Sequence, residues 1–168
     1  MSRAFVKELD GDALGDDQPE IPESPHPNYV TPRGLAELKA RLAGLAAEKE
    51  RLARETSDLE AKLALAQTER KMRYFASRIE HAIPVDPAQQ PKDEVAFGAI
   101  VRVAGEDGNE RDYAIVGEDE ADAAHGKVSW VSPLARALTG AKTGQFVTWK
   151  RPAGDVELEI LSIRYEAA

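Results

Sequence analysis

The sequence contains no cysteine, and aromatic side chains make up only 6% of its 168 residues. Without cysteine there are no disulfide bonds, no thiolate chemistry and no cysteine-type zinc sites, which fits a reducing cytoplasm. With few aromatic residues, a core has to be mostly aliphatic. Because 42% of the residues are hydrophobic, we expect a packed core that needs no covalent cross-links.

Long apolar runs are also missing. No stretch approaches the roughly 20 apolar residues that a membrane-spanning helix needs. The N-terminal residues Met1 to Glu23 are acidic and lack the apolar stretch of a secretory signal. The sequence therefore predicts a bacterial-type protein of the cell interior. We expect it to work in the cytoplasm and to have no membrane partner.

Positive charge is scarce, because the formal net charge is −8. Phosphate neutralisation by basic side chains drives binding to DNA, so we do not expect independent, tight binding to duplex DNA. Residues 31–83 are the exception, with eleven basic and eight acidic residues. This middle segment is the part of the chain that we expect to lie nearest to nucleic acid.

Residues 1–28 are rich in Asp, Gly and Pro, and their composition predicts a disordered acidic tail. A helix is expected to follow, because Thr31 is a good N-cap and Pro32 suits the first helical position. Leucines then recur with heptad spacing, at Leu35, Leu38, Leu42, Leu45 and Leu52.

The heptad pattern weakens around residues 54–58 and resumes in a second stretch that Pro84 ends. The second seam consists of Ala61, Leu65, Thr68, Met72, Phe75, Ile79 and Ala82. Two arms of nearly equal length around a polar turn predict an antiparallel coiled-coil hairpin over residues 29–84. One continuous helix that forms an intermolecular coiled coil is the alternative, and it would make the protein an oligomeric structural adaptor instead of a monomer.

A linker is expected over residues 85–91, followed by a β-rich domain over residues 92–168. Short alternating segments separated by Gly-rich and Pro-containing turns predict strands in a mostly antiparallel sheet. These segments are residues 97–103, 112–116, 128–131, 146–150 and 156–165. A short helix is expected over residues 132–138. The predicted fold class is therefore α+β, with the helical hairpin first and the β domain second.

Several blocks of the C-terminal part resemble the C-terminal domain of the GreA and GreB transcript-cleavage factors. They are Phe97-Gly98-Ala99, residues 115–122, Val131 to Leu138 and residues 152–160, in the order and spacing of that family. The start of the first helix, Thr31 to Leu35, is also similar to the family's helix start. The resemblance covers about four-fifths of the chain.

This resemblance implies an FKBP-like β domain that holds the rim of the secondary channel of bacterial RNA polymerase. It also implies that the coiled coil enters the channel and that acidic residues at its tip help hold a catalytic Mg²⁺ of the polymerase. The polymerase then hydrolyses the backtracked RNA itself, so the chain is expected to be no enzyme and to have no cofactor or metal of its own. Nascent RNA is an indirect partner. Prolyl isomerase activity is not expected, because a fold does not carry a function.

The tip is where the sequence departs from the family. The family pattern is Gly-Asp-x-x-Glu-Asn-x-x-Tyr, and Asp58 matches its first acid, whereas Ala61 occupies the place of the second. Glu55 and Glu60 are the other candidate tip acids. Each arm is also about one heptad shorter, which withdraws the tip by roughly 10 Å. Two hypotheses stay open: Asp58 assists transcript cleavage, or it only caps the second helix of a factor that occupies the channel without cleaving.

Two further sets of residues are candidates for contacts. Basic residues on the second helix are predicted to face RNA or polymerase acids, with a solvated coiled-coil face as the alternative: Arg70, Lys71, Arg73 and Arg78. The resemblance implies polymerase docking for a second set: Ser132, Pro133, Arg136, Glu118 and Asp119. For Ser132 and Pro133 the alternative is a simple helix cap. The three histidines, His26, His81 and His125, show no metal-ligand spacing.

Overall fold

The structure is a computed structural model that describes residues 18–55 and 58–166 of the chain. The first 17 residues of the expected acidic tail, and Thr56 and Ser57 of the expected tip, lie outside the described residues. The chain separates into two compact units. One contains the helical hairpin from Lys39 to Glu80, and the other contains residues 26–38 together with everything after Glu80. Residues 26–38, expected partly in the tail and partly in the hairpin, therefore belong with the β domain.

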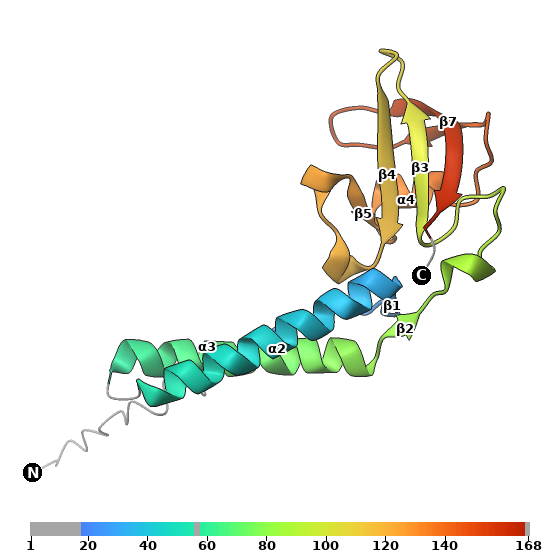
Figure 1. Ribbon diagram of the computed structural model, residues 1–168. Helices are drawn as coiled ribbons and strands as arrows, with labels where there is room; N and C mark the ends of the chain where they lie inside the picture. Colours follow the sequence, from blue (N-terminus) through green and yellow to red (C-terminus); the bar gives the residue numbers. More distant parts are fainter. Residues whose placement is uncertain (1–17, 56–57, 167–168) are drawn as a thin grey trace, which may run out of the picture. The chain divides into compact units, whose positions relative to one another are not determined.

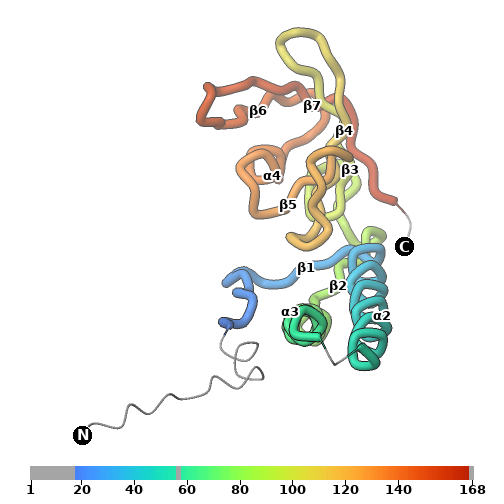
Figure 2. The backbone as a smooth tube through the Cα atoms, turned by 90° about the vertical axis from the view of Figure 1, so that its left-hand side faces the viewer, coloured from blue at the N-terminus to red at the C-terminus, as the bar shows by residue number. Residues whose placement is uncertain are grey.

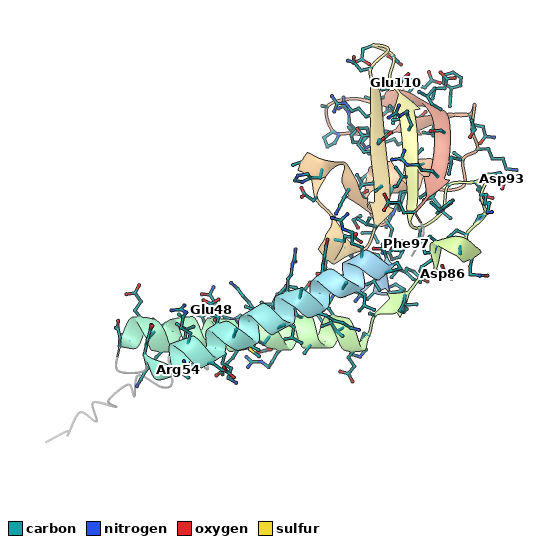
Figure 3. All side chains as sticks on the ribbon, viewed as in Figure 1. Glu48, Arg54, Asp86, Asp93, Phe97 and Glu110 are labelled. Carbon is teal, nitrogen blue, oxygen red and sulfur yellow. The ribbon has the colours of Figure 1, made fainter. Side chains whose placement is uncertain are left out.

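The hairpin is formed by helix α2 (Pro32–Arg54) and helix α3 (Leu59–Glu80). The two helices lie side by side and run in opposite directions (Figures 1 and 2). Arg54 ends α2 beside the turn (Figure 3). The alternative of one continuous helix is therefore excluded, and the expected helical hairpin is confirmed.

The contacts between the two arms fix their antiparallel register. Near the turn, Lys49 Nζ lies 3.8 Å from Glu69 Oε1. Further from the turn, the Arg41 guanidinium lies 5.6 Å from the centroid of the Phe75 ring. All positions of the two predicted heptad seams are buried or half-buried, and Leu38, Leu52 and Thr68 are the most buried of them. Burial of this apolar seam holds the arms together.

The β domain contains a five-stranded sheet with the strand order β5-β4-β3-β7-β6. The strands are β3 (Ala99–Ala104), β4 (Glu110–Val116), β5 (Lys127–Ser129), β6 (Phe146–Trp149) and β7 (Val156–Tyr165). All neighbours are antiparallel except β4 and β5, which are parallel. The expected fold class is confirmed, and the parallel pair is a detail that the alternation pattern did not specify.

The core lies on one face of this sheet. Burial alternates along β3, where Ala99, Val101 and Val103 are buried, as expected for a strand with one covered face. Helix α4 (Pro133–Leu138) contacts β5 and β6 and buries Leu134 and Leu138. Single-turn 3₁₀ helices lie in the connections: η1 (Pro87–Gln89), η2 (Glu118–Glu120) and η3 (Ala123–His125).

A two-stranded parallel sheet joins the chain before α2 to the chain after α3. Strand β1 (Tyr29–Val30) pairs with strand β2 (Ile83–Pro84). The Ile83 amide donates to the Asn28 carbonyl at 2.8 Å, and the Val85 amide donates to the Val30 carbonyl at 3.0 Å. Pro84 lies between these two donors and has no N–H to leave unpaired.

Candidate functional site

The tip of the hairpin is the first candidate site. Asp58 lies immediately before α3, and its Oδ1 accepts a hydrogen bond of 3.1 Å from the backbone amide of Glu60. The Asp58 carbonyl also accepts from the Lys62 amide at 3.1 Å. These two bonds make Asp58 the N-cap of α3, which is the structural role that the sequence left open.

The two other candidate acids lie on opposite sides of the turn. Glu55 follows the last residue of α2, and its Oε1 lies 3.6 Å from Arg51 Nη1. Glu60 belongs to the first turn of α3 and is exposed. Ala61, at the place of the family's second acid, offers no oxygen ligand. Among the described residues, no three His, Asp or Glu side chains are grouped closely enough to hold a metal ion. Of the two acids in the family's tip pattern, this chain therefore has a counterpart only for the first, Asp58.

The basic face of α3 is the second candidate site. Arg70 and Arg73 lie one helical turn apart, so they project from the same side of the helix. Both are hydrogen-bonded to residues that precede the hairpin: Arg70 to Gln18 and Arg73 to Glu20. Lys71 is exposed, whereas Arg78 is buried and only 3% exposed. Arg78 is thus not part of a solvated basic surface.

A groove of about 670 Å³ on the β domain is the third candidate site. The predicted docking residues Ser132 and Pro133 line it where α4 begins. Ser132 is also the N-cap of α4, since its Oγ accepts from the Ala135 amide at 3.2 Å. Ser132 therefore caps α4 and also lines the groove, so its role as a helix cap does not exclude the predicted role in docking.

Aromatic and basic side chains complete the lining of this groove, and the sequence did not assign them to it. Tyr113 and Trp149 pack edge to face with their centroids 6.5 Å apart. The Arg151 guanidinium lies 5.2 Å from the centroid of the Trp149 ring. Alternation along β4 and β6 predicts which side of the sheet these rings occupy, but it does not show that the two rings meet.

The remaining predicted docking residues lie elsewhere. Arg136 is exposed on α4 but does not line the groove. Glu118 and Asp119 belong to η2, in the connection between β4 and β5. The neighbouring Glu120 is only 8% exposed, and its Oε2 accepts a hydrogen bond of 2.6 Å from the Thr31 hydroxyl. Burial of this carboxylate was not predictable from the sequence, because Glu120 lies in a run of three acids that resembles a solvated loop.

The known proteins that are similar to this chain are transcription elongation factors. Residues 90–165 match the family model described as "Transcription elongation factor, GreA/GreB, C-term". The chain is 39% identical over 154 residues to the transcription elongation factor GreB of Neisseria meningitidis serogroup B, covering 82% of this chain and 94% of the relative. It is 38% identical over 152 residues to GreA of Alkalilimnicola ehrlichii, covering 81% of this chain and 96% of the relative.

Two solved structures are similar over most of the chain at lower identity. The GreA factor homolog Gfh1 of Thermus thermophilus is 20% identical, with a TM-score of 0.40, and covers 83% of this chain and 99% of that structure. The elongation factor GreA/GreB of Nitrosomonas europaea is 20% identical, with a TM-score of 0.41, and covers 82% of this chain and 99% of that structure. No helix among the described residues is both long and apolar enough to cross a membrane.

Proposed function

This chain belongs to the GreA/GreB family of transcription elongation factors, and from that membership we propose that it binds bacterial RNA polymerase as a monomer and places its hairpin in the secondary channel. The observation that carries this proposal is the intramolecular hairpin itself. Its two arms pair with each other through a buried seam, so the coiled coil needs no second chain.

We further propose that the hairpin modulates elongation without stimulating RNA cleavage. Support comes from the tip, where Asp58 already caps α3 and Ala61 replaces the second acid. Mg²⁺ requires oxygen ligands at about 2.1 Å in a demanding geometry. A single capping carboxylate on a shortened hairpin is a poor source of such ligands.

Over the aligned region, the Neisseria relative differs in length from this chain by an amount that a shorter hairpin would account for. Since 82% of the 168 residues is about 138, the 154 aligned positions include about 16 that have no counterpart in this chain. Loss of one heptad from each arm removes 14 residues and keeps the seam in register. The difference in length therefore has the size that paired heptad loss predicts.

The groove beside α4 is the surface that we propose for docking to the polymerase. Its lining combines the aromatic side chains of Tyr113 and Trp149 with Arg111 and Arg151. Aromatic and arginine side chains are the types that dominate binding energy at protein interfaces. The proposal keeps Ser132 and Pro133 as docking residues and adds Trp149.

A backtracked elongation complex assembled from purified bacterial RNA polymerase tests the proposal. We expect the factor to bind the complex and to change pausing or elongation rate, without shortening the RNA faster than in a reaction that lacks the factor. A GreB relative with the complete tip pattern is the positive control. RNA shortening that Asp58→Ala abolishes would establish the cleaving alternative, and absence of binding to polymerase would overturn the whole assignment.

A further inference from the structure

An acidic segment that precedes the hairpin lies along one face of α3. Its central contact is a two-pronged ion pair, in which Arg73 Nε and Nη2 donate to the two carboxylate oxygens of Glu20 at 2.9 and 2.7 Å. One contact flanks the pair on each side: Arg70 donates to Gln18, and the Ser77 hydroxyl donates to Glu23 at 2.9 Å. All of these residues belong to the same compact unit.

The three contacts follow one another in register. The partners are 52, 53 and 54 residues apart in sequence, so residues 18–23 advance along α3 as the helix itself advances. The helical positions 70, 73 and 77 have the spacing of a single helix face. An extended segment with no secondary structure of its own is thus laid along that face, with a contact at each successive turn.

The segment occupies donors that suit phosphate. An arginine fork binds a carboxylate and a phosphate with the same bidentate geometry. The Arg73 hydrogen bond lowers the pKa of Glu20, assisted by the charges of Arg73 and Arg70, so Glu20 is ionised at neutral pH. An RNA backbone that approaches this face therefore meets arginines that already hold an anion.

We propose that residues 18–23 form an internal strap that competes with RNA phosphate for the Arg70–Arg73 face of α3. The proposal rests on the proposed function, because RNA is the polyanion that a hairpin in the polymerase channel would meet. The strap weakens binding of RNA to the free protein, and RNA must displace it to reach the arginines. The Arg73 and Glu20 side chains are 55% and 61% exposed, so the strap is held weakly enough to be exchanged.

Binding of a fluorescently labelled single-stranded RNA to the full-length chain, followed by anisotropy, tests the strap directly. Glu20→Gln with Glu23→Gln removes two charges from the strap. Glu106→Gln with Asp155→Asn removes two charges from exposed turns of the β domain and is the matched control. We expect the strap variant to bind RNA about 1.4- to fivefold more tightly at low salt, the range that weak surface ion pairs support. The gain should vanish toward 1 M salt, where screening acts within about 3 Å.

Arg73→Gln identifies the site. Added to the strap variant, it should remove most of the gain in affinity, because the competed donor is then gone. An equal gain in the control pair, no gain in the strap variant, a gain that survives Arg73→Gln, or no RNA binding by any variant would each overturn the proposal. So would a gain for poly-glutamate without a gain for RNA, which would point to an acidic protein partner. Binding to polymerase is measured separately, so failure of the strap and failure of the proposed function give different results.

Discussion

The Thr31 hydroxyl donates a hydrogen bond of 2.6 Å to Oε2 of Glu120, a residue 89 positions further along the chain. Thr31 also caps α2, since its Oγ1 accepts from the Gly34 amide at 2.9 Å. One hydroxyl thus satisfies the first turn of α2 and a buried carboxylate at the same time. The start of α2 is fixed on the β domain by this pair, and the first two predictions follow from it.

Thr31→Ala should lower the free energy of unfolding by about 2 kcal/mol. Loss of an N-cap costs about 1 kcal/mol, and leaving the Glu120 carboxylate without its donor adds a similar amount. Thr31→Ser keeps the hydroxyl and is the control, with an expected loss below about 0.5 kcal/mol. Urea unfolding measures both variants. Equal stability of the Ala and Ser variants would contradict the dual role of Thr31.

Gly34→Ala should destabilise the protein by about 1 kcal/mol, although alanine is the better helix former. A Cβ at this position would lie 2.6 Å from Glu120 Oε2, so the carboxylate has to move away from Thr31. Gly44→Ala is the matched control on the same helix, because nothing lies within 4 Å of its added Cβ. It should stabilise the protein by about 0.5–1 kcal/mol. Thermal unfolding that shifts both variants in the same direction would refute the close approach.

Asp58→Asn and Asp58→Ala separate the capping role of Asp58 from any role of its charge. Asn is as good an N-cap as Asp, so Asp58→Asn should change stability little, whereas Asp58→Ala should cost about 1 kcal/mol. If the carboxylate only caps α3, the Asn variant should affect polymerase elongation as the unsubstituted protein does. A large change in that effect with unchanged stability would assign the charge a function.

The strand pattern and the caps were the parts of the fold most accessible from sequence. Alternation along residues 97–103 and 156–165 predicted β3 and β7 to within a few residues, because each strand has one buried face. The N-caps Thr31 and Ser132 were predictable because a hydroxyl before a proline and an apolar run is a local signal. These features depend on neighbours in sequence, which a single sequence displays.

The contacts that the sequence did not predict join segments far apart in the chain. The two-residue strands β1 and β2 are too short for any periodicity, and their pairing depends on the hairpin bringing them together. The register of Glu20 on Arg73 has no local signature either, since acidic residues in a Pro-rich stretch usually indicate disorder. Residue type and spacing were enough to identify the candidate tip acids. The hydrogen bond by which Asp58 caps α3 became clear only in the structure.

Tyr165→Phe should destabilise the β domain by about 1–3 kcal/mol, since the hydroxyl donates to the Glu94 carbonyl at 2.6 Å and accepts from the Ala96 amide at 3.0 Å. Burial, the largest influence, raises the pKa of Tyr165 above its ordinary value of 10.0. The neutral hydroxyl is thus favoured in the folded state. Its contribution is complete below pH 10 and is lost as the pH rises through the higher folded pKa.

Absorbance titration of tyrosinate checks this direction. The titration curve of the unsubstituted protein should contain a component that ionises above pH 10, and Tyr165→Phe should remove that component. A titration curve with the same late component in both proteins would assign the raised pKa to a different tyrosine.

Trp149→Ala should weaken binding to RNA polymerase at least tenfold if the groove beside α4 is the docking surface, because buried aromatic anchors carry much of the energy of an interface. Phe146→Ala lies on the same strand but outside the groove, with a side chain that is 62% exposed, and should change the affinity less than about twofold. Fluorescence competition for the polymerase measures both. Thermal unfolding of each variant separates lost docking from lost folding, and equal affinities of the two folded variants would exclude the groove.

The β1–β2 pairing joins the two ends of the hairpin independently of the length of its helices. Backbone hydrogen bonds join residues 28–30, before the first helix, to residues 83–85, after the second helix. The length of the two helices can therefore change without changing these hydrogen bonds. A longer or shorter coiled coil could replace the residues between these two points without a change in the sequence of the β domain. Adding or deleting matched helical repeats would thus change the reach of the hairpin and leave the β1–β2 hydrogen bonds in place.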